Sequence, residues 1–400
     1  MKQLNGSTRA CALLFISAAM LAMTVVSLPA QTFQIRSFDG KDGAFSWAQL
    51  IQGSNGNLYG TTQNGGGGAC PTGCGTVFAI TPTGKETVFS FDGTNGSNPL
   101  AGLVQGTDGN FFGITSQGGT DNGGGDCSTG CGTIFKITPA GQLTTLHNFG
   151  YKDGADGTGT LVQATDGNLY GTTETGGFFG AGVIFKISTS GTFSVLHSFT
   201  GGADGDTPVA GLIQAADGDL YGTTWGYNDQ YSGTIFKITL TGTLTTLYSF
   251  TGITDGALPF APLYQAKDGN FYGTTEEGGS ASYGTVFSMT PSGALTTLHS
   301  FTGDADGNTP ISPLIEASDG NFYGTTSYGG KYPSFGTIFR MTPSGTLAII
   351  HNFNGTEGAY AYGGLIQAKD GALYGETFAG GSSSACSFGC GVIYSLSATK

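Results

Sequence analysis

Seven copies of one segment of about 50 residues occupy almost the whole 400-residue chain. In its clearest form the segment reads Leu-Ile-Gln-Ala-x-Asp-Gly-Asn-Leu-Tyr-Gly-Thr-Thr, a glycine-rich loop, Gly-Thr-Ile-Phe-Lys-Ile-Thr-Pro-x-Gly and Leu-Thr-Thr-Leu-His-Ser-Phe. A Tyr-Gly or Phe-Gly step marks the centre of every copy, at Gly60, Gly113, Gly171, Gly222, Gly273, Gly324 and Gly375. From the third copy onward the spacing is 51 residues. A repeat of this length, built of short strands, is typical of a closed β-propeller.

Each copy predicts four strands, named A to D in chain order. The Leu-Ile-Gln segment predicts strand A, and the Asp-Gly or Asn-Gly pair after it tolerates the positive φ of a tight hairpin into strand B, Leu-Tyr-Gly-Thr-Thr. Strand C, Thr-Ile-Phe-Lys-Ile-Thr, is rich in β-branched and aromatic residues. A Pro-Gly turn leads to strand D. The B–C and D–A loops are therefore expected on one face of the propeller.

The last copy lacks strand D, because the chain ends soon after its strand C. Residues 32–38 match strand D and have no strand A, B or C before them. We therefore predict an all-β, seven-bladed propeller over residues 31–400, with four-stranded blades and a last blade closed by the N-terminal strand. Closure removes the sheet edges that an open solenoid, the alternative, would expose.

Composition excludes some classes of partner. The net charge is −13, and there are no runs of Lys or Arg. Binding to nucleic acid or to anionic lipid is therefore not expected. The regular apolar positions between the 73 glycines indicate a folded ring rather than disorder. We expect a monomer without a cofactor.

Residues 1–30 read as a signal peptide. Lys2 and Arg9 precede an apolar stretch, and Leu28, Pro29 and Ala30 form a plausible cleavage site. The alternative is an uncleaved membrane anchor, for which the apolar run is short. The expected location is secreted or periplasmic, with no membrane contact after cleavage.

Besides Cys11 in the predicted signal peptide, six cysteines occur in three Cys-x3-Cys pairs, each at the same loop position of its copy: Cys70 and Cys74, Cys127 and Cys131, Cys386 and Cys390. An even count in an exported chain favours disulfides. Pairing within each loop is the simplest connectivity, although six cysteines allow 15. A metal site is disfavoured, because no second ligand pair follows within the repeat.

The repeat resembles the tandem GloVer repeat of the bacterial choice-of-anchor repeat proteins. The shared pattern is Gly-Leu-Ile-Gln-Ala-x-Asp-Gly-Asn-Leu-Tyr-Gly-Thr-Thr followed by Gly-Gly and Gly-Thr-Ile-Phe-Lys-Ile, over about residues 31–400. The resemblance implies an exported protein and carries no catalytic assignment. Members of the family bear C-terminal sorting tails, whereas this chain ends in Ser397-Ala398-Thr399-Lys400, which favours a released or periplasmic product.

No catalytic or metal-binding constellation stands out. The four histidines, His147, His197, His299 and His351, share one position in strand D that other copies fill with Arg, Phe or Tyr. This variation indicates an amphipathic filler. Acids before glycine recur between strands D and A, at Asp42, Asp156, Asp204, Asp255, Asp306 and Glu357. They indicate turns; a calcium loop is the alternative, but it lacks the distal bidentate Glu.

The B–C loops vary most and carry the candidate ligand-binding residues. Copies 3 to 6 place aromatic residues in these loops: Phe178, Phe179, Trp225, Tyr227, Tyr231, Tyr283, Tyr328 and Tyr332. All but Tyr283 are predicted here as ligand contacts. Flat aromatic rings beside carboxylates suit sugars, and they also suit a protein partner. Packing against neighbouring loops is the structural alternative.

These features favour a non-catalytic binding or scaffold module, with extracellular polysaccharide as the leading ligand and a surface protein as another. A polysaccharide lyase or glycoside hydrolase is the alternative, because the same loops carry four carboxylates that could act as acid and base: Glu174, Asp229, Glu276 and Glu277. A purely structural surface or matrix protein is the third hypothesis.

Overall fold

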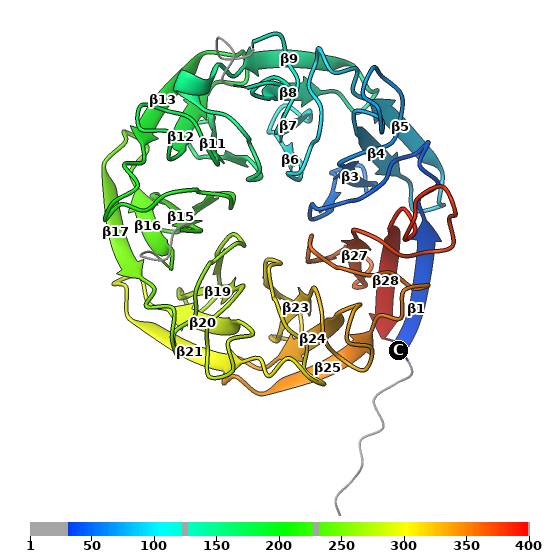
Figure 1. Ribbon diagram of the computed structural model, residues 1–400, viewed down its shortest axis with the longest axis vertical. Coiled ribbons are helices and arrows are strands. Elements are labelled where there is room, and N and C mark those ends of the chain that lie inside the picture. The colour runs from blue at the N-terminus through cyan, green and yellow to red at the C-terminus, as the bar shows by residue number, and fades with distance from the viewer. Residues whose placement is uncertain (1–30, 122–126, 227–231, 399–400) are drawn as a thin grey trace, which may run out of the picture.

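The computed structural model describes residues 31–121, 127–226 and 232–398. Their strands form seven four-stranded antiparallel sheets, which are arranged as blades around a central opening (Figure 1). This is the seven-bladed β-propeller that the repeat predicts. The predicted signal peptide, residues 1–30, lies outside the described residues. Within the described ranges, no helical segment has the length and hydropathy needed to cross a bilayer.

Each blade takes its strands in the predicted order. The innermost A strands are β2 (Ile51–Gln52), β6 (Val104–Gln105), β10 (Val162–Gln163), β14 (Ile213–Gln214), β18 (Tyr264–Gln265), β22 (Ile315–Glu316) and β26 (Leu365–Gln367). The B strands are β3 (Leu58–Thr62), β7 (Phe111–Thr115), β11 (Leu169–Thr173), β15 (Leu220–Thr224), β19 (Phe271–Thr275), β23 (Phe322–Thr326) and β27 (Leu373–Thr377). The C strands are β4 (Thr76–Ile80), β8 (Thr133–Ile137), β12 (Val183–Ile187), β16 (Thr234–Ile238), β20 (Thr285–Met289), β24 (Thr337–Met341) and β28 (Val392–Ala398). The outermost D strands are β5 (Glu86–Ser90), β9 (Leu143–Asn148), β13 (Phe193–Ser198), β17 (Leu244–Ser249), β21 (Leu295–Ser300), β25 (Leu347–Asn352) and β1 (Gln31–Ser37), and a short 3-10 helix η1 (Tyr151–Asp153) lies between β9 and β10.

The N-terminal strand closes the last blade, as predicted. β1 pairs with β28 over seven residue pairs, from Gln31 opposite Ala398 to Ser37 opposite Val392. Figure 1 shows β1 in blue beside β28 in red. The Phe33 ring on β1 also stacks on His351 of the preceding blade, with centroids 3.9 Å apart. The closing strand is therefore held by backbone pairing and by packing against a neighbouring blade.

Neighbouring blades share their hydrophobic cores. One cluster, for example, combines Tyr170 and Ile184 of the third blade with Leu212 and Phe236 of the fourth. The glycine of each Tyr-Gly or Phe-Gly step leaves room for an aromatic ring of strand C. At Gly171 an added Cβ would lie 2.6 Å from the Phe185 ring. Because no single copy can bury these side chains alone, the ring folds as one unit.

A belt of side-chain hydrogen bonds joins the inner strands around the channel. The last residue of strand A is Gln in six blades and Glu316 in the sixth blade. Each Gln donates to the turn glycine of its own blade, as Gln105 does to Gly109, 3.1 Å away. Its Oε1 accepts a backbone N–H from the preceding blade, and Glu316 accepts in the same way. The seven donor–acceptor pairs are Ser54–Gln105, Thr107–Gln163, Thr165–Gln214, Ala216–Gln265, Lys267–Glu316, Ser318–Gln367 and Lys369–Gln52.

The three cysteine pairs form the predicted disulfides within their loops. The bonds are Cys70–Cys74, Cys127–Cys131 and Cys386–Cys390. They lie in the B–C loops of the first, second and seventh blades, which are consecutive around the ring. Such bonds persist in oxidising compartments, so they fit an exported protein.

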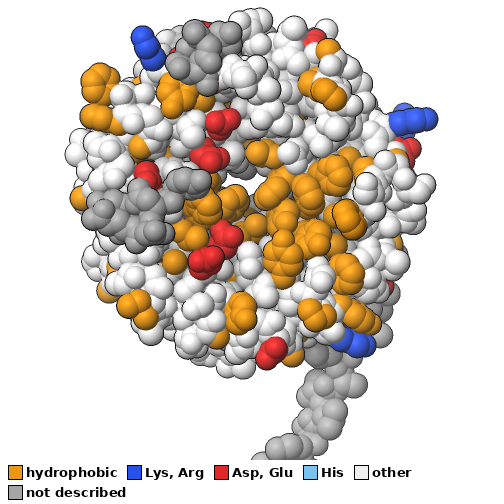
Figure 2. Space-filling view, in the orientation of Figure 1, with side chains coloured by type: hydrophobic (Ala, Val, Ile, Leu, Met, Phe, Trp, Pro, Cys, Tyr) orange, Lys and Arg blue, Asp and Glu red, His pale blue; other side chains and the backbone are white. Residues whose placement is uncertain are grey.

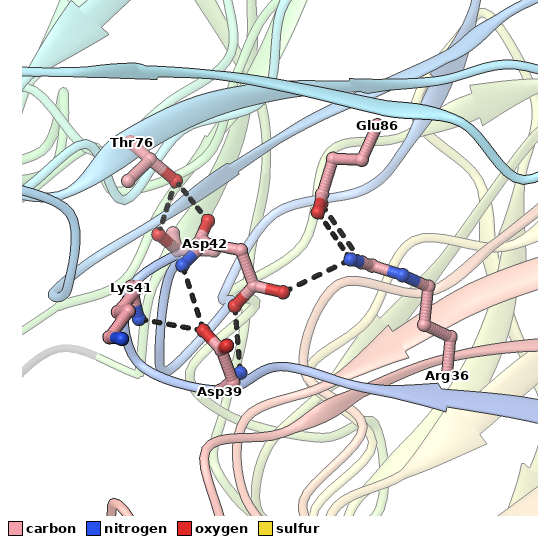
Figure 3. A network of polar contacts seen from close by, with 7 residues as sticks. Arg36, Asp39, Lys41, Asp42, Thr76 and Glu86 are labelled. Carbon is pink, nitrogen blue, oxygen red and sulfur yellow. Dashed lines mark hydrogen bonds and ion pairs between the residues drawn. The ribbon is translucent and has the colours of Figure 1, made fainter.

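Arg36 ties the closing strand to the first blade (Figure 3). Its Nη1 donates to Glu86 Oε1 on β5 over 2.9 Å, and its Nη2 donates to Asp42 over 3.1 Å and to the second Glu86 oxygen. Burial raises the pKa of both carboxyls, and the nearby guanidinium works against that rise. The seam between the last and first blades therefore depends on one cation shared by two partly buried acids.

We expect Arg36→Met to destabilise the protein by about 1–2 kcal/mol, because it leaves two partly buried carboxyls without their cation. The matched control is Lys41→Met, which makes the same change of charge at an exposed side chain of the adjacent turn. The urea midpoint of unfolding measures both. Equal shifts in the two variants would show that net charge matters and that the Arg36 contacts do not.

Candidate functional site

A cavity of about 750 Å3 runs through the centre of the ring. Its wall is made by the A strands and by the loop residues just before them, with contributions from all seven blades. Trp47, Glu174, Phe260 and Tyr362 line it at the end formed by the B–C and D–A loops. We call the cavity the central channel and this end the channel mouth.

The backbone of the D–A loops is the same at the mouth of every blade. One residue in each loop is not glycine and yet has a φ between 52° and 61°: Phe45, Asn98, Asp156, Thr207, Leu258, Thr309 and Tyr360. Side chains other than glycine rarely adopt this left-handed conformation, which is held where surrounding contacts require it. The carbonyl of each residue accepts a hydrogen bond from the first residue after strand B of its own blade. These donors are Gln63, Ser116, Glu174, Trp225, Glu276, Ser327 and Phe378.

This pairing places two variable positions of every blade beside each other around the mouth: the left-handed residue and the first residue after strand B. The repeat has no consensus residue at either position, so each blade can present a different side chain on the same backbone. A third variable position, two residues after the left-handed one, carries Trp47, Phe260 and Tyr362 in the first, fifth and seventh blades. The mouth is therefore the part of the ring where the seven copies differ while the backbone stays constant.

Aromatic side chains of the seventh and first blades form one half of the mouth. We call Phe45, Trp47, Tyr360, Tyr362 and Phe378 the aromatic cluster. Trp47 stacks on Tyr362 with centroids 4.2 Å apart, and Phe45 stacks on Phe378 at 4.8 Å. The Trp47 indole donates to Gln63 Oε1 over 2.9 Å, which fixes the plane of its ring. All five side chains are partly exposed, so the cluster presents a rigid aromatic surface to solvent.

Acidic side chains of the third and fifth blades lie on the other half. Burial raises the pKa of Glu174, and the charge of Asp156 raises it further. Burial also raises the pKa of Glu276, whereas a hydrogen bond of 3.1 Å from the Trp225 indole lowers it. Trp225 in turn contacts Phe260 edge-on. The two acids are therefore held in partly buried positions and keep protons more readily than exposed carboxyls.

Figure 2 shows the two halves. Hydrophobic side chains gather on one side of the central opening, over β27 and β3, and acidic side chains flank the opening elsewhere.

The structure separates the predicted ligand-binding residues into two groups. Trp225 and Tyr328 lie at the mouth, where the Tyr328 ring is 5.1 Å from Tyr360. Phe178 is 84% exposed and its backbone contacts Ser198 at the end of β13, on the outside of the blade. Phe179 packs on Phe178, and the loop of Tyr332 contacts Asn352 of outer strand β25 through Lys331. Tyr227, Tyr231 and Asp229 lie outside the described residues.

The acids grouped from the sequence also divide. His197 contacts Asp204 and His299 contacts Asp306 over 3.0–3.1 Å, so these D–A acids hold the strand-D side chains. In the third blade Asp153 takes that role toward His147, and Asp156 instead belongs to the mouth. The third D–A loop carries two Asp-Gly pairs, at Asp153 and Asp156. The sequence analysis groups Asp156 with the other D–A acids, but the equivalent residue in the structure is Asp153. In the described part of the chain, no three His, Cys, Asp or Glu side chains come together as a metal site.

The seven blades, the N-terminal closing strand and the loop-lined channel define a repeat protein with the β-propeller fold. The chain belongs to the Gloeobacter/Verrucomicrobia repeat family, whose model matches residues 23–126, 124–267 and 233–400. This confirms the resemblance to the GloVer repeat. No curated protein matches the chain by sequence at a significant level.

Several solved structures share the fold. A streptogramin B lyase is 16% identical with a TM-score of 0.62, over 92% of this chain and 98% of the lyase. The extracellular domains of two hybrid two component systems of B. thetaiotaomicron are 11% and 14% identical, with TM-scores of 0.58 and 0.57. Both matches cover 92% of this chain and 42% or 43% of the other. At such identities the likeness shows the fold alone.

Proposed function

We propose that this chain is an exported binding propeller that holds a segment of extracellular polysaccharide at the channel mouth. The observation that carries the proposal is the aromatic cluster, a set of stacked and partly exposed rings that faces carboxylates across an opening. The apolar face of a sugar ring packs on aromatic rings, and its hydroxyls donate to carboxylate oxygens. The three disulfides and the extracellular propellers of similar fold support an exported location.

The rigidity of the cluster favours binding. Trp47 and Tyr362 are fixed by stacking and by the indole hydrogen bond to Gln63, so little side-chain entropy is lost when a ligand packs on them. The backbone hydrogen bonds from the residue after each strand B to the seven left-handed residues hold the D–A loops in one conformation. A ligand of the mouth therefore meets a surface that is already formed.

We expect Trp47→Ala to lower the affinity of the protein for its polysaccharide about tenfold or more, which corresponds to about 1.4 kcal/mol. The experiment measures binding of the purified protein to a panel of plant and bacterial polysaccharides, with released product assayed in the same samples. Trp225→Phe keeps a ring but removes the donor to Glu276, and it is expected to weaken binding less. Phe178→Ala is the matched control, because it removes an exposed aromatic side chain by the outer strand.

Two outcomes contradict the proposal. Equal loss in Trp47→Ala and Phe178→Ala, with both variants folded, would move the site away from the mouth. Failure of the wild-type protein to bind any polysaccharide in the panel would reject the ligand class and favour a protein-contacting or structural role.

The second candidate function is a polysaccharide lyase or hydrolase at the same mouth. The observation that favours it is the burial of Glu174 and Glu276, which raises the pKa of both carboxyls in the direction that a general acid requires. This candidate predicts released oligosaccharide in the panel experiment. It also predicts that Glu276→Gln abolishes the release while retention persists; absence of product throughout rejects it.

A further inference from the structure

We infer that the central channel binds an alkyl or aryl aglycone attached to the end of the glycan, so that the ligand of the proposed function is a glycoside with an apolar aglycone. The sugar lies at the mouth, as in the proposed function on which this inference rests, and the aglycone enters the channel.

Apolar side chains line the channel from its mouth end inward. Leu100, Val209 and Ile311 occupy the third variable position of the mouth in the second, fourth and sixth blades. Val104, Val162 and Ile213 line the channel further in, on the A strands of the second, third and fourth blades. A volume of about 750 Å3 lies within the roughly 300–1,000 Å3 that is typical of sites enclosing a small organic molecule. Apolar surface of this extent gains free energy when an apolar group displaces water from it.

Five polar side chains of the wall hydrogen-bond within the protein, whereas Glu174 and Lys369 also line the cavity. Gln49 donates to the Leu365 carbonyl over 2.6 Å, and Thr158 donates to the Val209 carbonyl over 3.0 Å. Thr160 Oγ1 accepts the N–H of Gly102, also over 3.0 Å. At the far end, Gln52 and Gln367 belong to the hydrogen-bond belt. An ordered water needs two to four polar partners, and these groups have few hydrogen bonds left to offer a water or a sugar.

The mouth and the channel are continuous. Trp47, Phe260 and Tyr362 line the cavity and also occupy variable positions around its opening. Glu174 lines the same end, so a molecule seated in the channel has its outer end beside a carboxyl. A hydroxyl-rich head group donates to that carboxyl, whereas a carboxylate head group is repelled by it and by Asp156. The order of groups from outside to inside is therefore sugar, then apolar body.

The test uses the neutral fluorophore N-phenyl-1-naphthylamine, which brightens in apolar sites. The purified protein is expected to bind the probe. Dodecyl maltoside, kept below its critical micelle concentration, is expected to displace it. Maltose is not expected to displace the probe. Dodecanoate should displace the probe at least tenfold more weakly than dodecyl maltoside does. Leu100→Trp narrows the channel at its mouth end and is expected to lower probe affinity at least tenfold. Ile253→Trp adds the same bulk at a D–A side chain that is 68% exposed, and it should leave affinity unchanged.

Leu100→Gln is a second variant in case the bulky one does not fold. It makes the wall polar without adding volume, and it should also lower the affinity for the probe. Absence of probe binding, or equal affinity in all three variants and the wild type, overturns the inference. Equal displacement by dodecanoate overturns the head-group assignment. If the probe binds as expected while no polysaccharide is retained, the channel site stands and the proposed function fails.

Discussion

Replacing Glu376 by Thr is expected to stabilise the protein at pH 7 by about 2 kcal/mol. Glu376 lies on β27 with 1% of its surface exposed, and neither carboxyl oxygen lies within normal hydrogen-bond geometry of another described residue. The Ser46 hydroxyl is close enough to oppose the burial-driven rise of the Glu376 pKa, but it donates to the Thr61 carbonyl instead. A buried polar group without a partner costs about 1–3 kcal/mol. In five other blades the same position is a Thr whose hydroxyl donates to a carbonyl of the next blade: Thr61, Thr172, Thr223, Thr274 and Thr325. The substitution therefore restores the pattern of the ring.

The gain should depend on pH. Burial raises the pKa of Glu376 well above its usual 4.5, so the folded protein keeps this proton where the unfolded chain loses it. Because the folded state then binds more protons, stability falls as pH rises from about 4.5 toward the folded pKa. Below that window the cost of ionisation vanishes. The difference between Glu376→Thr and wild type is therefore larger at pH 7 than at pH 4.

Urea unfolding of wild type, Glu376→Thr and Glu376→Gln at both pH values measures these effects. The Gln variant cannot ionise but stays polar, so it should remove this pH dependence while gaining little at pH 4. A Glu376→Thr protein less stable than wild type at both pH values would show that the carboxyl makes a favourable contact in the folded protein.

Deleting residues 31–37 is expected to abolish stable folding, with a loss on the order of 5 kcal/mol or more, comparable to the whole stability of many domains. The deletion removes all seven backbone pairs between β1 and β28, and it exposes β28 as a sheet edge open to association. It also removes the Phe33 ring from His351 and Tyr394, and the Arg36 ion pairs.

Thermal unfolding and light scattering of the truncated protein check this expectation. A peptide of residues 31–38 added in trans should restore part of the stability, and a scrambled peptide of the same composition should not. A truncated protein that melts cooperatively at the wild-type temperature would contradict the role of β1 in closing the ring.

The ring itself could be predicted because its determinants recur seven times. The Tyr-Gly step, the Asp-Gly turn and the unpaired strand-D match at residues 32–38 each give local signals, and together they count the blades. The hydrogen-bond belt cannot be predicted from the consensus Gln alone, since the backbone N–H that this Gln accepts belongs to the preceding blade, about 50 residues away along the chain.

The candidate site was only half predicted. The variable B–C loops predict aromatic contacts, of which Trp225 and Tyr328 lie at the mouth and Phe178 lies on the outside of a blade. Trp47 and Tyr362 are not among the predicted contacts, because they lie in D–A loops, although those loops are expected on the same face. The signal was present: both residues occupy a position where the repeat has no consensus. Their stacking across the seam between the last and first blades depends on closure, which sequence neighbours do not reveal.

The location of a bound oligosaccharide in a crystal structure of the complex tests the central claim most directly. The account predicts a sugar ring at the channel mouth, packed on Trp47 or Tyr362 and with a hydroxyl within hydrogen-bond distance of Glu174 or Glu276. A sugar bound by the outer strands, beside Phe178 and Phe179, with the mouth holding only water, would contradict it.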